Sequence, residues 1–308
     1  MTALARSAMV IRLPLWLLRV CLNLILGTLL CLSPLTALLV LGWLTRRMKA
    51  RVDAHRGRPA IYPGWVLGPR GKGWIVRLLG GLAANIRAGV MTATGLAALT
   101  LPFSMLWLGA WWAGWENSFN KGYEQSAVGP VTWLIGALIA LPILAHLPMA
   151  LVHAATEQRL GAFFEFRRIR SVTRAAGWRV PWLALMSVVV GVPFFGLRAL
   201  PVFVEGIVPG FSEMPAAEQM QVAQIFGLAG AALCFAVLVF LRDRASGIYA
   251  RAAGSGGRTP SRAITALWLV ISCAIWAGLP LLLLFGQFMN YTPVLWLTHP
   301  VFLLPWAG

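Results

Sequence analysis

The sequence has little charge and very little acid. Only 11% of its 308 residues are charged, and 26 Lys and Arg stand against 9 Asp and Glu. An ordinary soluble domain carries about 25% charged residues, so this chain could not cover its surface with polar groups in water. Because 59% of the residues are hydrophobic, the composition indicates an integral membrane protein.

The sequence also lacks the common motifs of enzymes. It contains no GxxxxGK[ST], HExxH, GxSxG or EF-hand loop, and nothing groups a nucleophile with a base. The four cysteines lie inside apolar runs without CxxC spacing, so a disulfide framework is not indicated. We therefore expect no enzyme activity, no cofactor and no bound metal.

What the chain does have is a series of long apolar segments. A membrane-spanning helix needs about 20 such residues. The sequence predicts an all-α fold: one polytopic transmembrane helix bundle over residues 1–308 with about six spans. These are expected at about 20–44, 90–112, 131–153, 181–204, 222–241 and 264–285.

The first apolar block, residues 13–44, leaves two interpretations open. It is longer than one crossing needs and short for two. One interpretation is a surface helix over residues 3–19 followed by one span. The other is a helical hairpin bent at Pro34, which the arginines near the N-terminus favour because it returns that end to the cytoplasm.

Positive charge is confined to particular loops. Three basic loops, at about 45–88, 157–180 and 242–263, hold 21 of the 26 Lys and Arg. Such a bias sets the orientation of membrane proteins, so these loops are expected in the cytoplasm, and a nucleic-acid partner is not indicated. Arginine and alanine are abundant while lysine is scarce, which is typical of a GC-rich bacterial genome. The expected location is the bacterial inner membrane.

Two of these loops contain apolar residues at helical spacing, flanked by arginines. Both predict amphipathic helices that lie on the membrane surface. The first leads into the span at 90–112, and the second lies within 157–180. Their arginines are expected to contact anionic lipid head groups: Arg77, Arg87, Arg167, Arg168, Arg170 and Arg174.

A few polar residues within the spans are candidates for function. His146 and His153 lie seven residues apart on one helix, with Glu157 four residues further on. A haem or metal would need a ligand from another span, and no other span offers a histidine, so we expect both to be hydrogen-bonded in the bundle. Arg198 and Glu205 are interpreted as an ion pair or as side chains that snorkel to the membrane interface, or alternatively as contacts for a substrate or ion.

Two further groups lie outside the spans. Glu165 is expected to pair with Arg159 or Arg168. A polar loop between the second and third spans could be simply solvated, or could line a mouth or bind a partner; its candidates are Glu116, Asn117, Asn120 and Lys121.

Two stretches resemble a known family. SPLTALLVLGWLTRRMKARV, followed by PGW at 63–65, and later PMALVHAATEQRLGAFFEFRRIRSV, are similar to the uncharacterised bacterial membrane family called domain of unknown function 4013. The similarity covers roughly residues 10–250 and does not include the loop GWENSFNKGYEQ. It implies a multi-pass membrane protein and brings no catalytic residues.

These observations favour a non-enzymatic scaffold or accessory subunit that binds partner proteins or anionic lipids. One alternative is a small-solute transporter or permease, supported by proline-kinked spans and by Arg198 and Glu205. A weaker alternative is a membrane enzyme acting on lipid head groups, with His146, His153 and Glu157 as its chemistry.

Overall fold

The structure is a computed structural model that describes residues 3–68, 73–120, 128–199, 204–254 and 260–281. These residues are helical with irregular connections and contain no strand, which confirms the all-α class. The helices are α1 (Ala3–Leu30), α2 (Pro34–His55), α3 (Trp74–Asn120), α4 (Val128–Glu157), α5 (Phe166–Ala176), α6 (Arg179–Ala199), α7 (Val204–Ile207), α8 (Ala216–Gly254) and α9 (Arg262–Trp276). The 3-10 turns are η2 (Leu160–Phe164) and η4 (Phe211–Glu213).

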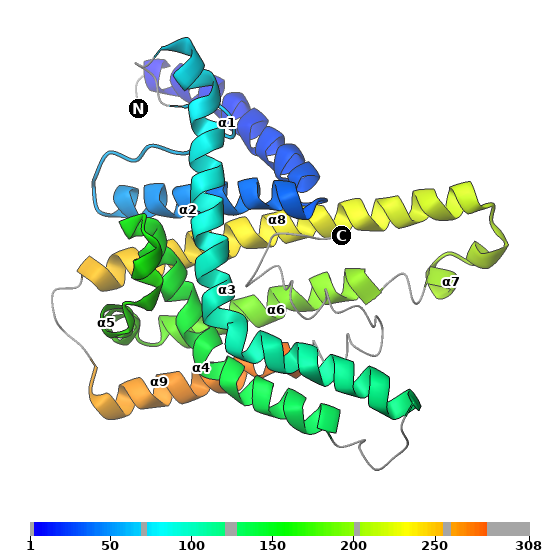
Figure 1. The fold of residues 1–308 in the computed structure, drawn as a ribbon. Helices are drawn as coiled ribbons and strands as arrows, with labels where there is room; N and C mark the ends of the chain where they lie inside the picture. Colours follow the sequence, from blue (N-terminus) through cyan, green and yellow to red (C-terminus); the bar gives the residue numbers. More distant parts are fainter. Residues whose placement is uncertain (1–2, 69–72, 121–127, 200–203, 255–259, 282–308) are drawn as a thin grey trace.

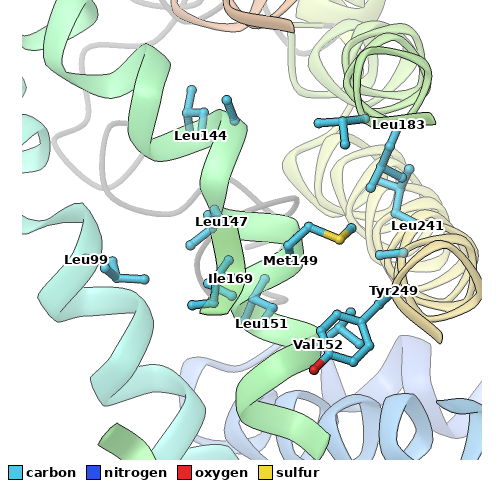
Figure 2. Packing of buried hydrophobic residues seen from close by; sticks show 14 of the residues in the cluster. Leu99, Leu144, Leu147, Met149, Leu151, Val152, Ile169, Leu183, Leu241 and Tyr249 are labelled. Atoms are coloured by element: carbon cyan, nitrogen blue, oxygen red, sulfur yellow. The ribbon is translucent and has the colours of Figure 1, made fainter. Parts of the chain in front are cut away.

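Helix α4 is the centre of the bundle. It contacts α2, α3, α5, α8 and α9, and it is the most buried of the long apolar helices. Figure 2 shows Leu99 of α3 on one side of α4, and Leu183 of α6 and Leu241 of α8 on the other. The core therefore consists of apolar side chains that α4 shares with the helices around it.

Among the described residues, fewer helices than predicted meet the length and hydropathy of a membrane span. Four described segments do so: Leu79–Ala110, Val128–Glu157, Ala216–Gly254 and Arg262–Leu281. A fifth would combine α5 with the first part of α6, across a bend of 92°. Several long apolar helices are thus present, as a membrane protein requires, but the prediction of six spans is not confirmed.

The first apolar block is broken. Helix α1 ends at Leu30 and α2 begins at Pro34, whose fixed φ suits the first turn of a helix. The expectation of one continuous helical span over 20–44 was therefore wrong. The chain bends near Pro34, where the hairpin interpretation placed the bend. The apolar part of α1, Leu17–Leu30, is shorter than a full span.

Two helices continue past the ends of the expected spans. Helix α2 continues to His55, and α8 continues to Gly254, well into the expected loops at 45–88 and 242–263. Both extensions are rich in Ala and Arg, which favour helix and which a hydropathy pattern cannot recognise. The charged residues therefore mark the end of the apolar segment in α2 and α8, but the helix itself continues through them.

The remaining irregular segment, 56–68, is packed against the helices. The indole of Trp65 stacks on Trp43 of α2 with ring centres 4.6 Å apart, and its Nε1 donates to Asn23 Oδ1 of α1 at 2.8 Å. Asn85 of α3 is fully buried and donates to the carbonyls of Gly64 and Trp65. The segment is therefore held against α1, α2 and α3 by specific side-chain contacts.

Helix α3 has two parts. Its first part lies across the directions of α8 and α9, and its second part runs beside α4 (Figure 1). Pro102 lies inside the helix, where a proline removes a hydrogen bond and permits bending. In the first part Trp74, Ile75 and Leu79 are exposed together with Arg77, and the interfacial position expected for this part stays a prediction.

Three elements that carry arginines lie together at one end of the bundle. Helix α5, the C-terminal end of α8 and the N-terminal end of α9 lie there, on the left of Figure 1, while α7 lies at the opposite end. We call this the basic end.

Candidate functional site

Helix α5 is the amphipathic helix predicted within residues 157–180. Its buried residues Ile169, Val172 and Ala176 repeat every three to four positions, so they form one face against the bundle. Its four arginines lie on the exposed part of the helix. Gly177 ends α5 at φ +59°, a conformation that side chains rarely adopt, and there the chain turns into α6.

A hydrogen-bonded group holds the start of α5 to the core. His153 of α4 is fully buried, with its Nδ1 2.8 Å from the Tyr249 hydroxyl and its Nε2 2.8 Å from Glu165 Oε2. Arg159 also donates to Glu165. The hydrogen bond from His153, followed by the charge of Arg159, lowers the pKa of Glu165, although burial acts in the opposite sense.

A cavity of about 570 Å³ opens beside α5, and we call it the α5 cavity. It is bounded by α3, α4, α5 and α9. Its lining has an apolar part, formed by Leu99, Pro142, Ile143, Ala145, Phe166, Ala266 and Leu269, and a polar part, formed by His146, Arg170, Thr173, Arg174, Arg262 and Thr265. This size is typical of pockets that hold a small molecule or part of a larger one.

The charge of the α5 cavity is entirely positive. No carboxylate lines it, and within the described part of the chain Arg170, Arg174 and Arg262 form no ion pair. Arg168 and Arg159 on the same segment are paired, with Glu157 and Glu165 respectively. The three cavity arginines are therefore available to an anion from outside the chain.

His146 reaches the same cavity from α4. Its ring lies 5.3 Å from that of Phe166 between centres, and its Nε2 is buried with no hydrogen-bond partner among the described residues. A buried polar atom without a partner costs free energy unless a bound group satisfies it. His146 thus adds a polar group in the interior of a cavity whose rim is basic.

The structure does not bring all the predicted site residues together. His146 and His153 lie on the same helix, α4, but have separate surroundings. Glu157 pairs with Arg168 at 3.4 Å and with neither histidine. Within the described residues no group of three His, Cys, Asp or Glu could hold a metal ion. The pairing of Glu165 with Arg159 is confirmed.

Of the predicted lipid contacts, Arg170 and Arg174 line the α5 cavity, while Arg77, Arg87, Arg167 and Arg168 are exposed away from it. The remaining candidates have side chains outside the described part of the structure: Arg198, Glu205, Glu116, Asn117, Asn120 and Lys121.

Sequence reasoning missed Arg262, Arg242 and Asp243. Arg262 was assigned to a loop, but it begins α9 and completes the rim of the α5 cavity. Arg242 was assigned to the same loop and is buried, with only 4% of its surface exposed. Asp243 accepts hydrogen bonds from Arg47 at 2.7 Å and Arg51 at 2.8 Å, so it joins α8 to α2. The only available signal was that Asp243 is the single acid of its loop.

The comparison with protein families matches residues 25–202 to the family described as protein of unknown function DUF4013. The chain belongs to this family. The match contains the α3, α4 and α5 side of the cavity, whereas Arg262 and the rest of α9 lie beyond it. No curated protein and no solved structure matches the chain.

Proposed function

We propose that this DUF4013 protein is a non-enzymatic module of the bacterial inner membrane that binds an anionic phospholipid in the α5 cavity. The observation that carries the proposal is that one cavity is lined both by three unpaired arginines and by apolar side chains. A phospholipid needs both parts, a cationic site for its phosphate and an apolar surface for its acyl chains.

The lining residues are arranged along the helices so that a lipid could bind with its head group at the basic end and its acyl chains deeper in the cavity. Arg262 begins α9 at the basic end, and Leu269 lies seven residues further along, roughly 10 Å deeper at 1.5 Å per residue. On α4, Pro142 and Ile143 precede His146, so they lie further than His146 from the C-terminal end of that helix. A head group at the rim would therefore place its chains against the deeper, apolar part of the cavity.

The positive-inside pattern supports a cytoplasmic location of the basic end. The cytoplasmic leaflet carries anionic lipid, and each nearby Lys or Arg contributes about 1 kcal/mol of attraction. Three arginines that act together are therefore worth on the order of a 100-fold preference for anionic over zwitterionic lipid.

The test is lipid binding by purified, delipidated protein. Short-chain phosphatidylglycerol and phosphatidylcholine are titrated into the wild type and into a variant that combines R170Q, R174Q and R262Q. We expect the wild type to bind phosphatidylglycerol more tightly, and the variant to bind both lipids equally weakly. Equal affinity of the wild type for the two lipids would contradict the proposal.

A further inference from the structure

Arg242 lies inside the bundle and not at its surface. Its side chain faces a second, separate cavity of about 30 Å³ between α4, α6, α8 and α9. The other lining residues are Leu147, Pro148, Leu151, Leu183, Ser187, Leu241, Ala245 and Trp276. None of them belongs to the α5 cavity, and Arg242 is the only charged residue among them.

No group in the described part of the chain neutralises Arg242. Its Nη1 is buried without a hydrogen-bond partner, and it forms no ion pair with a described acid. The adjacent acid, Asp243, is engaged by Arg47 and Arg51 of α2. The hydroxyl of Ser187 donates to the carbonyl of Leu183, its own helical neighbour.

A buried cation without a counter-charge is costly, and arginine cannot escape the cost by losing its proton. The size of the cavity limits what could supply the missing charge. About 10–15 Å³ suffices for one water molecule, so 30 Å³ leaves room for a small anion such as a halide.

We infer that the cavity beside Arg242 is a binding site for a halide-sized anion, which is chloride under cellular conditions. The guanidinium Nη1 donates to the anion, and the surrounding apolar side chains exclude water. The anion thereby neutralises the buried charge of Arg242 at the contact of α4, α6 and α8. This inference is independent of lipid binding, because the two cavities share no residue.

Thermal unfolding of the detergent-solubilised protein tests the inference. The wild type is compared in sodium chloride and in sodium gluconate at equal ionic strength. A tenfold excess of chloride over its Kd should raise the Tm by about 3 °C, saturably, and bromide should replace chloride. The same Tm in both salts would overturn the inference.

Two methionine variants locate the site. R242M removes the buried charge, so its Tm should not depend on the anion and, in gluconate, should be at least that of the wild type. R244M, which changes an exposed arginine two residues away, should keep the chloride dependence. If R242M keeps it too, or is less stable than the wild type in gluconate because a carboxylate of the chain is the true partner, the inference is wrong.

A second measurement does not depend on any variant. Crystals of the wild type soaked in bromide should show an anomalous peak within hydrogen-bonding distance of Arg242 Nη1. The absence of such a peak in data that reveal the Arg242 side chain would overturn the inference as well.

Discussion

At the scale of the residue, His153 is a fully buried polar group of the core. Its Nδ1 lies 2.8 Å from the Tyr249 hydroxyl and its Nε2 lies 2.8 Å from Glu165 Oε2, so both ring nitrogens have a hydrogen-bond partner. The sequence predicted a hydrogen-bonded histidine, but not Tyr249, which lies 96 residues away in the chain. Partners that distant are set by how helices pack, which periodicity does not encode.

Removing the Tyr249 hydroxyl should be costly. Y249F leaves a buried nitrogen of His153 without a partner, so the free energy of unfolding should fall by about 1–3 kcal/mol. Y62F, at a residue that is 49% exposed, is the control and should change it by no more than about 0.5 kcal/mol. Chemical denaturation in one detergent measures both variants, and equal effects would contradict the assigned role of Tyr249.

The pH dependence follows from Glu165, whose pKa is lowered from its ordinary value of 4.5. Its ionised form is favoured in the folded protein, so it stabilises the fold fully above pH 4.5 and loses that effect as the pH falls through the lowered folded value. Wild type should have a higher Tm than E165Q at pH 7, and the difference should shrink below pH 4.5. A difference independent of pH would contradict the assignment.

At the scale of the element, the contact of α2 with α3 depends on glycine. A Cβ at Gly42 would lie 1.8 Å from the carbonyl oxygen of Asn85, and one at Gly89 would lie 2.1 Å from that of Leu38. The two backbones therefore touch, as at other membrane helix interfaces built from small residues. The sequence contained both glycines, but only the crossing of the helices shows that they face each other.

Alanine at either position should separate the two helices. G42A and G89A should each destabilise the protein by about 3 kcal/mol or more, because backbone cannot move aside as a side chain does. G109A is the matched control on α3, where a Cβ meets nothing within 4 Å, and it should be neutral or stabilising. The Tm of the three variants checks this, and a G42A variant as stable as G109A would contradict the close crossing.

The ends of the elements were harder to predict than their presence. The apolar parts of α3, α4 and α8 overlap the expected spans, because hydropathy over about 20 residues reports burial in a membrane or a core. The continuation of α8 to Gly254 could not be predicted from hydropathy. Arg242 was consequently placed in a loop, and its buried environment depends on α4 and α6, which pack around it.

At the scale of the whole molecule, the proposal requires that the basic end face the cytoplasm. A single cysteine replacing Ser171 on α5, in a background with the four native cysteines replaced, should react with a membrane-impermeant maleimide only after the inner membrane is opened. One replacing Glu213, in η4, should react in intact spheroplasts. The reverse pattern would invert the topology and place the α5 cavity on the wrong leaflet.

The central claim is that the α5 cavity, and not the general basicity of the surface, selects anionic lipid. Native mass spectrometry of protein extracted from its membrane tests it most directly. We predict that the wild type retains phosphatidylglycerol or cardiolipin, that the R170Q/R174Q/R262Q variant loses it, and that R77Q/R87Q/R167Q, which removes equal charge outside the cavity, keeps it. Equal retention by both triple variants, or equal loss from both, would contradict the claim.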